Sequence, residues 1–588
     1  MQKQQLFFDT ECYPNYFLLV FKDLKGNEEC FVKDENNVLP VARIRKLLET
    51  RQTIGFNSRM YDIPMITYAL SGVSNSLLKE MSNSLIPDKK LVEAGLVDST
   101  FNVIKKNNLW CPFEYDHIDI INVAHGVKAG LKIYGARIGS RKLQDLPYNH
   151  LEPLSQEQKK DVKTYCINDV DLTADLFKYL HKELAVRELL NKEYNVDSRS
   201  KSDAQIAELL FEKKVASSGK KVKSFDFKYV APEYINFKTD ILKRFTDIEF
   251  KGIIGDEILK EGVIEDVVIN GTEYSCGIGG LHSKENKRFI KASDDEYLID
   301  VDVVSYYPTI ILNNGYCPEY YIKEDFLKFY QKIYHDRVIA KKEGDKDKSE
   351  VYKIILNGSF GKFGDKFSKL YSPKLLIHTT ITGQLSVLML IEKLEEYGYK
   401  VISSNTDGIA VIVKKNKYDF FKKIVKSWED KVKFTTEEVR YSALYNHSVN
   451  SYIAVKEDGS LKLKGTFAES AINKNINAPI CKKAVINYIT RDIAIEDTIL
   501  KTKHNPLDLI KMRKVKNGGY WKGEYLGKIV RWYWSTKGEP ITNPKGDKVA
   551  GTDDAFPIMD MGDGIKDLHY DRYIKESYKL LSWIGIKI

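Results

Sequence analysis

The chain has few cysteines, no repeats and no long run of apolar residues. Its seven cysteines are scattered over 588 residues without a C-x-x-C pair, so neither a zinc site nor a disulfide framework is predicted. No apolar run approaches the roughly 18 residues of a membrane span. The first residues, MQKQQLFFDTE, place acids directly after a short apolar run, unlike a secretory signal. These absences predict a cytoplasmic protein with reduced thiols and no membrane association.

The chain also lacks an unusual content of hydrophobic or charged residues and a large net charge. Hydrophobic residues make up 43% of the chain and charged residues 29%, which excludes disordered and fibrous classes. The length predicts about three or four domains. A net charge of +9 permits a polyanionic partner but is too small to identify one.

Two acids are predicted at strand ends. In YKVISSNTDGIAVIV (residues 399–413), two β-branched runs flank a polar tetrad, which predicts a β-hairpin with Asp407 at its tip. In LIDVDVVSYYPTI (residues 298–310), a hydrophobic strand leads to Asp302. Mg²⁺ takes one or two protein carboxylates and fills its other positions with water and phosphate oxygens. The pair therefore indicates a phosphoryl-transfer site.

A second group of acids lies in the first 185 residues. Asp9 and Glu11 stand two apart in a predicted strand and so share a face. Asp62 precedes a proline that could open a helix, and Tyr165 and Asp169 stand four apart in a helical pattern. Each pattern alone also fits a solvated surface. Together, the four carboxylates could surround two metals while Tyr165 orients the attacking water.

Basic residues recur beside predicted helices and strands. Residues 324–361 predict a helical hairpin whose cations could converge on a triphosphate, or could be solvated. The residues predicted to grip the triphosphate or to line the base are Arg337, Lys341, Lys353, Asn357 and Phe360. Lys462 and Lys464 share one face of a predicted return strand, where they could contact backbone phosphates. Lys142 is a candidate helper lysine for the upstream acids, or a solvated side chain.

Residues 511–537 hold eight Lys or Arg and a single acid, interleaved with aromatics. This mixture fits phosphate contacts with stacking. It fits equally a small aromatic core surrounded by snorkelling lysines. A glycine-rich stretch, GIGGLHS (residues 277–283), predicts either a plain turn or a connector that touches nucleic acid.

Three motifs in order resemble the polymerase motifs of family B DNA polymerases. They are D-x-x-S-Y-Y-P (residues 302–308), K-x-x-x-N-G-S-F-G (353–361) and N-T-D-G (405–408). The upstream acids resemble a 3′-5′ proofreading exonuclease of the DEDDy kind. The resemblance covers nearly the whole chain, which looks like a small bacteriophage replicative polymerase. It implies a multidomain α/β and α+β architecture, with an RNase H-like exonuclease domain and a right-hand polymerase of palm, fingers and thumb.

The resemblance also implies domain boundaries. They are an exonuclease domain at 1–185, a connecting region and the start of the palm at 186–295, palm at 296–322, short helical-hairpin fingers at 323–364, palm at 365–465, and a thumb and C-terminal DNA-binding region at 466–588. The three polymerase motifs are separated by 51 and 54 positions. Such short gaps leave little room for the insertions of protein-primed polymerases, so protein priming and built-in strand displacement are not expected. Asp9 lies so near the N-terminus that no extra N-terminal domain is expected either.

Site roles follow from the same resemblance. Each active site would hold two Mg²⁺ ions, which Mn²⁺ could replace. The implied metal ligands are Asp302, Val303 and Asp407 in the polymerase site, and Asp9, Glu11, Asp62 and Asp169 in the exonuclease site. Tyr307 would be the steric gate that selects deoxynucleotides, and Tyr452 would lie at the primer terminus. The implied partners are primer-template DNA, dNTPs and other phage replication proteins, around a monomer in the cytoplasm of an infected bacterium.

Four positions depart from the family pattern. Asn405 replaces the first Asp of D-T-D, Asn450 replaces the Lys of K-x-Y, Gly277 replaces the Tyr of a Y-x-G-G linker, and Phe360 replaces a Tyr. Two alternatives therefore stay open. One is a single-strand 3′-5′ exonuclease whose polymerase half binds DNA without extending it. The other is a basic nucleic-acid-binding protein whose acids are structural.

Overall fold

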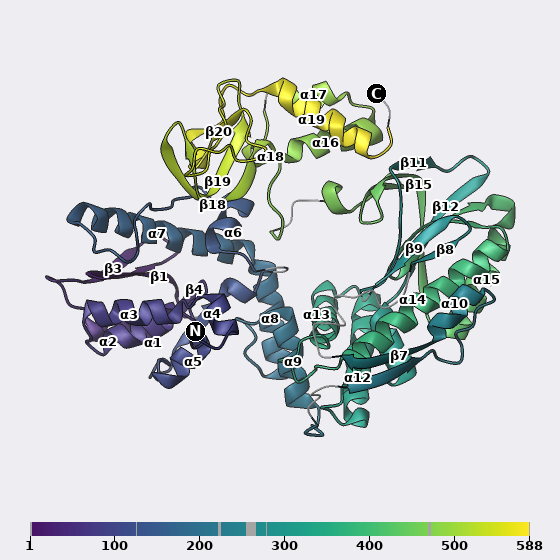
Figure 1. The fold of residues 1–588 in the computed structure, drawn as a ribbon, viewed down its shortest axis with the longest axis horizontal. Helices are drawn as coiled ribbons and strands as arrows, with labels where there is room; N and C mark the ends of the chain where they lie inside the picture. Colours follow the sequence, from purple (N-terminus) through teal and green to yellow (C-terminus); the bar gives the residue numbers. More distant parts are fainter. Residues whose placement is uncertain are drawn as a thin grey trace. The chain divides into compact units, whose positions relative to one another are not determined.

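The computed structural model describes residues 3–124, 126, 128–220, 225–253, 266–277, 279–468, 472–501 and 503–586. The chain folds into two compact units (Figure 1). Unit 1 comprises Met1–Ser202, Ser470–Ile480 and Lys501–Tyr573, and unit 2 comprises Asp203–Glu469, Cys481–Leu500 and Ile574–Ile588. The prediction of a mixed α/β chain with more than one domain is confirmed.

Unit 1 is built on a five-stranded sheet in the order β3-β2-β1-β4-β5. Its strands are β1 (Gln5–Tyr13), β2 (Tyr16–Lys22), β3 (Glu28–Lys33), β4 (Gln52–Gly55) and β5 (Asp116–Asp119). β1 and β2 form an antiparallel hairpin, whereas β4 runs parallel to β1 and β5 parallel to β4. Alternate residues of the central strand β1 therefore face opposite sides of the sheet.

Helices cover both faces of this sheet (Figure 1). One face carries α6 (Leu131–Ile138) and α7 (Gln156–Tyr179), with Phe7, Leu18 and Val162 in the shared core. The other face packs against helices around Phe8 and Leu78. Those helices are α1 (Val41–Thr50), α2 (Asp62–Leu70), α3 (Asn75–Leu85) and α5 (Thr100–Lys106); α4 (Lys89–Glu93) and α8 (His181–Tyr194) complete this part of unit 1.

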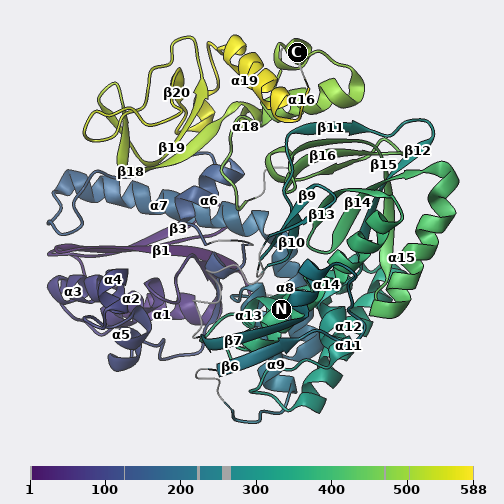
Figure 2. The ribbon, with the colours of Figure 1, turned by 45° about the vertical axis from the view of Figure 1, so that its right-hand side comes forward.

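A three-stranded antiparallel sheet from the C-terminal part of the chain also belongs to unit 1. Its strands are β18 (Lys511–Trp521), β19 (Glu524–Trp534) and β20 (Ala555–Pro557), and α18 (Pro506–Leu509) precedes them. The sheet lies beside α6 and α7 in Figures 1 and 2. Trp532, Tyr533 and Trp534 are buried, so for these three aromatics the structure has a small core rather than a stacking surface.

Unit 2 contains a ten-stranded sheet in the order β17-β16-β15-β12-β14-β13-β10-β9-β8, with β11 paired to β15. Its strands are β8 (Val267–Ile269), β9 (Thr272–Cys276), β10 (Leu281–Ser283), β11 (Arg288–Lys291), β12 (Glu296–Val303), β13 (Lys400–Asn405), β14 (Gly408–Lys414), β15 (Thr436–Ser448), β16 (Ser451–Lys456) and β17 (Leu461–Leu463); β6 (Phe225–Val230) and β7 (Asp247–Ile253) pair separately. The predicted hairpin at residues 399–413 is confirmed as β13-β14. The segment KKIVKSWEDKVKFTTEEV (residues 422–439) predicts one helix from its sequence, and this prediction is wrong at the C-terminal end, because the helix ends at Val432 and β15 begins at Thr436.

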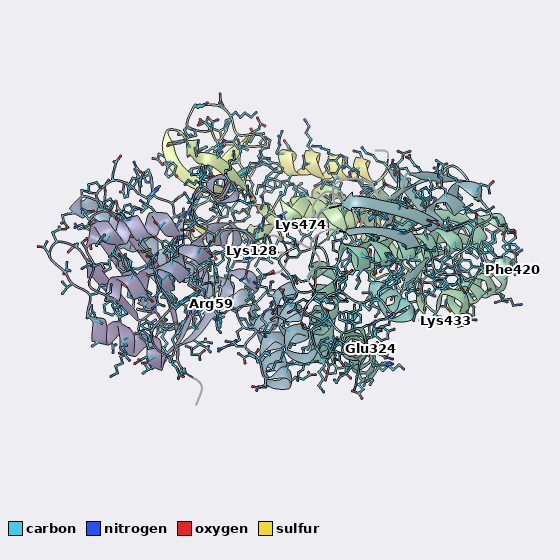
Figure 3. The ribbon with its side chains drawn as sticks, turned by 60° about the horizontal axis from the view of Figure 1, so that its bottom comes forward. Arg59, Lys128, Glu324, Phe420, Lys433 and Lys474 are labelled. Atoms are coloured by element: carbon cyan, nitrogen blue, oxygen red, sulfur yellow. The ribbon has the colours of Figure 1, made fainter. Side chains whose placement is uncertain are left out.

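One face of the large sheet is covered by helices and the other carries the acids. In β12, Ile299, Val301 and Val303 point into a core with α14 (Pro373–Glu396) and α15 (Tyr418–Val432), which Figure 2 shows against the sheet. The alternate residues Asp300 and Asp302 therefore lie on the opposite face. Phe420 and Lys433, labelled in Figure 3, mark the two ends of α15 and are exposed.

The remaining helices of unit 2 include the predicted helical hairpin. They are α9 (Asp203–Lys214), α10 (Asp240–Lys243), α11 (Tyr306–Asn314), α12 (Lys323–Glu343), α13 (Lys346–Lys362), α16 (Pro479–Arg491) and α17 (Ile495–Ile499); α19 (Tyr570–Trp583) spans both units. α13 packs closely on α9, because a Cβ at Gly358 would overlap the carbonyl oxygen of Asp203. By length and composition alone α14 could cross a membrane, but 83% of its most apolar window is buried inside the protein.

Candidate active sites

Four predicted carboxylates meet at one cavity of about 820 Å³ in unit 1. Asp9 and Glu11 come from the central strand β1, Asp62 begins α2, and Asp169 lies in α7. All four line the cavity. The sheet and the helices on its two faces thus bring together acids that are up to 160 positions apart in the chain.

Hydrogen bonds fix part of this acidic cluster. One oxygen of Asp62 accepts from the Thr10 backbone N–H at 3.1 Å and from the Thr10 hydroxyl at 2.6 Å. Asp9, Glu11 and Cys166 present ligand atoms that all lie within 4.8 Å of one another. Burial raises the pKa of the Cys166 thiol well above its usual range, so this thiol is protonated at neutral pH and is a poor metal ligand.

The electrostatics of the cluster favour a bound cation. Burial, followed by the neighbouring carboxylates, raises the pKa of Asp9 well above its usual range, that of Glu11 to about 8 and that of Asp62 to about 7. In addition, Oδ1 of Asp169 is buried and has no hydrogen-bond partner among the described residues. Crowded carboxylates with a free oxygen have the chemistry of a divalent-metal site.

Lys132, which the sequence analysis missed, is the basic residue of this cluster. Its ammonium donates hydrogen bonds to the Tyr165 hydroxyl and, at 3.2 Å, to Asp169. Burial lowers the pKa of Lys132, but Asp169, Asp145 and Glu11 outweigh it and the net shift is upward. The proposed helper Lys142 is exposed and forms an isolated β-bridge with Asp560 instead. Only tertiary packing of α6 on α7 creates the Lys132 contact, so no local pattern could have found it.

The second acidic site lies in unit 2, where Asp302 and Asp407 come together. Asp302 pairs with Gly408 across β12 and β14, and the Val303 N–H donates to the Asp407 carbonyl oxygen at 2.9 Å. A Cβ at Gly408 would overlap Asp302 Oδ1, so a larger residue at this position would displace the Asp302 carboxylate. Both acids line a cavity of about 230 Å³. The strand ends that carry Asp302 and Asp407 thus lie together, as the sequence predicts.

Two non-glycine residues with left-handed backbones flank these acids. Ser305, before α11, has φ of 53°, and Thr406, beside Asp407 in the hairpin turn, has φ of 57°. Such conformations cost about 1–3 kcal/mol each and persist where the surrounding structure holds them. The Thr406 N–H donates to the Leu281 carbonyl oxygen at 2.6 Å, so the predicted glycine-rich connector packs on the hairpin tip. Ile278 of that connector lies outside the described residues.

Asp300 is a third acid of this site that the sequence analysis missed. Lys462 places its ammonium 2.7 Å from Asp300 and 3.1 Å from Asp302, and Tyr441 donates a hydrogen bond to Asp300. Burial and then Asp302 raise the pKa of Asp300. Lys462, expected on DNA phosphates, thus stands between two carboxylates. The signal for Asp300 was its position two residues before Asp302 in a strand, which places both on one face.

Two of the four departures from the family pattern, Asn405 and Asn450, touch each other. The Asn405 side chain donates to Asn450 Oδ1 at 3.2 Å and to the Val449 carbonyl oxygen at 3.3 Å. Tyr452 and Lys464 line the same cavity as Asp302 and Asp407, with the Lys464 ammonium 5.9 Å from the centre of the Tyr452 ring. The structure therefore brings together all three residues predicted to contact DNA.

The predicted nucleotide-binding residues lie on α11, α12 and α13. The Tyr307 ring stacks on Phe360 with centroids 4.2 Å apart and an interplanar angle of 7°, and the Tyr307 hydroxyl donates to the Gly279 carbonyl oxygen. Arg337 donates to the Ser305 hydroxyl at 3.2 Å.

The other two cations of the helical hairpin have acidic partners of their own. Lys341 lies 3.5 Å from Glu437, and Lys353 lies 3.0 Å from Glu350. Asn357 is exposed on α13. The three cations have separate partners and do not converge on one group.

Comparisons with known proteins match only part of the chain. No family model matches it. It is 26% identical over 187 residues to DNA polymerase 1 of Saccharolobus solfataricus, covering 30% of this chain and 20% of that protein. It is 33% identical over 82 residues to DNA polymerase II of Escherichia coli, covering 14% of this chain and 10% of that protein. The matched segments thus span a fifth or less of these relatives.

A solved structure of the family B DNA polymerase from the archaeon Pyrobaculum calidifontis aligns with the whole chain and with 78% of its own length. Its TM-score is 0.41 and its sequence identity is 14%. The sequence matches show that the chain is homologous in part to DNA polymerases.

Proposed function

We propose that the protein is a template-directed DNA polymerase of the family B type with a 3′-5′ exonuclease. The observation that carries the proposal is the meeting of Asp302 and Asp407 across β12 and β14, where both acids line one cavity and Gly408 leaves room for the Asp302 carboxylate. The homology to two DNA polymerases supports it. A replicative role in a bacteriophage, as a monomer with other replication proteins, is part of the same proposal and rests on the sequence resemblance.

The polymerase site fits divalent cations. Lys462 already brings a positive charge to the Asp300 and Asp302 carboxylates, which marks the position as one that attracts cations. Asp302, Asp407 and the Val303 carbonyl oxygen would hold two Mg²⁺ ions. Ions bound there would lower the pKa of the primer 3′-hydroxyl and neutralise charge on the leaving pyrophosphate.

The surrounding residues would then select and hold the nucleotide. The stacked ring of Tyr307 would close the space that a ribose 2′-hydroxyl needs. Arg337, Lys341 and Lys353 would move from their present partners onto the triphosphate, since a charge-assisted phosphate contact is stronger than an exposed ion pair. Tyr452 and Lys464 would hold the primer terminus.

The exonuclease site would work in unit 1 with Asp9, Glu11, Asp62 and Asp169 as metal ligands. Metal ions bound there would activate a water for attack on the terminal phosphodiester. Tyr165, neutral because burial raises its pKa well above its usual range, would orient that water through its hydroxyl. Lys132 would hold Tyr165 and Asp169 in place.

One labelled primer-template tests both activities. With Mg²⁺ and a single dNTP, the primer should gain only the nucleotide that the template specifies; without dNTPs it should shorten from the 3′ end. Trimming without extension under Mg²⁺ or Mn²⁺ would favour the alternative, an exonuclease whose polymerase half only binds DNA. DNA binding without either reaction would favour a purely structural role for the acids.

A further inference from the structure

The C-terminal sheet β18-β19-β20 is docked on the part of unit 1 that carries the acidic cavity. Arg531 of β19 is fully buried. It donates hydrogen bonds to the carbonyl oxygens of Ser140, Arg141, Ile558 and Met559. The Leu143 N–H also donates to the Met559 carbonyl oxygen at 2.8 Å. A buried guanidinium with four carbonyl partners fixes the sheet firmly, because removing any partner would leave charge unsatisfied.

Asp145 joins β19 to the surroundings of the acidic cluster. Its Oδ2 accepts from the Lys528 backbone N–H at 3.0 Å and lies 3.5 Å from the Tyr525 hydroxyl. Between them, Gly527 has φ of 101°, and a Cβ there would come within 2.7 Å of Asp145 Cβ. Asp145 lies in the segment between α6 and α7 that also carries His150, a residue that lines the cavity. The backbone of Lys528 is thus held at a defined place near the cavity.

Lys528 is held on Asp145, beside the segment that carries the lining residue His150. It is exposed and has no ion-pair partner among the residues that the structure describes. His150 lines the cavity, and its pKa is lowered by burial and then by the charges of Lys79, another lining residue, and Lys528. Positive charge from Lys79 of α3 and from Lys528 of β19 therefore lies near a cavity that also contains four carboxylates.

This combination of charges fits a phosphodiester chain. The carboxylates with their cations would take the phosphate that is cleaved, and the basic groups would take its neighbours. We propose that Lys528 contacts the backbone of the single-stranded 3′ end that enters the cavity, which makes the C-terminal sheet part of the exonuclease substrate-binding surface. The inference rests on the exonuclease function proposed above.

Trimming of a labelled oligothymidylate at several salt concentrations tests the inference. In Lys528→Ala, KM should rise about fivefold, and the slope of log KM against log salt should fall by about 0.7, the value for one lost phosphate contact on a single strand. The value of kcat and the melting temperature should not change. Lys528→Arg should behave as wild type. Lys522→Ala is the matched control, because Lys522 lies at the tip of the same hairpin and is paired with Glu539 at 2.9 Å.

The outcomes distinguish a failure of the role of Lys528 from a failure of the proposed exonuclease function. An unchanged KM and salt slope in Lys528→Ala, with normal trimming by wild type, would overturn the role of Lys528. A lower kcat with an unchanged slope would overturn it too, since that pattern indicates a structural effect. Failure of the wild-type protein to trim the oligonucleotide would instead refute the exonuclease function.

Discussion

At the scale of residues, Asn405 and Asn450 form a neutral pair beside the cavity that Asp302 and Asp407 line. Because the Asn405 amide donates to both Asn450 and the Val449 carbonyl oxygen, an Asp at 405 would face that carbonyl and add charge near Asp302 and Asp407. We expect Asn405→Asp to slow extension about tenfold, a barrier increase of about 1.4 kcal/mol. Adding Asn450→Lys should restore most of the rate by supplying a counter-charge.

Single-turnover extension by the two single variants and the double variant measures this coupling. Asn450→Lys alone is the control, and it should have a smaller effect than Asn405→Asp. Equal losses in Asn405→Asp and in the double variant would show that the two positions act independently.

The contact of Lys462 with Asp300 gives a second prediction at this scale. Lys462→Met leaves the buried Asp300 carboxylate without its cation, so the metal-free protein should lose about 1–3 kcal/mol in free energy of unfolding. Asp300→Asn in the same background should recover part of that loss. Melting temperatures in EDTA measure the effect, and additive effects of the two substitutions would contradict a direct pairing.

At the scale of elements, β1, α2 and α7 hold carboxylates that repel one another. The pKa values of Glu11 and Asp62 are raised to about 8 and about 7, so the folded state keeps protons that the unfolded state releases. The contribution of these two carboxyl groups to the stability of the metal-free protein is therefore largest at acidic pH and is lost as pH rises from about 4 to about 8.

Asp9→Asn with Glu11→Gln should flatten this decline and raise the melting temperature at pH 8 in EDTA by a few degrees, which corresponds to about 1 kcal/mol or more. Mg²⁺ should stabilise the wild-type protein at pH 8 and have little effect on the variant. The measurement is a series of thermal melts between pH 5 and pH 8, and parallel curves for the two proteins would contradict the account.

Local sequence patterns predict the elements well and their long-range partners poorly. The hairpin around Asp407 and the helix pair that carries Arg337 follow from β-branched runs and helical periodicity. The contact of Lys132 with Tyr165 does not, because it arises only when α6 packs on α7. The resemblance to a known family located Asp62 and Asp169, which alone look like ordinary surface acids.

At the scale of the whole molecule, the two acidic sites lie in different units. We therefore expect Asp9→Ala with Glu11→Ala to reduce 3′ trimming by at least about a hundredfold and to leave extension within about twofold of wild type. Parallel assays on one labelled substrate check this. Loss of both activities would show that the units do not function independently.

In the whole molecule, the grouping of residues 501–573 in one compact unit with the first 202 residues is a long-range feature. It depends on contacts such as the one between Arg531 and the Ser140 carbonyl, which are 391 positions apart. Neither periodicity nor composition encodes a contact of that separation. The same limit applies to Lys462, whose two carboxylate partners are 160 and 162 positions away.

The most direct test of the central claim is extension of a labelled primer-template by Asp407→Ala, with Mg²⁺ and four dNTPs. The account predicts that extension falls by at least about a thousandfold, because a metal ligand of the polymerase site is lost. Trimming in the absence of dNTPs should persist, because the acids proposed for that reaction lie in unit 1, and an unchanged melting temperature shows that the variant is folded. Retained extension in Asp407→Ala would contradict the assignment of this site.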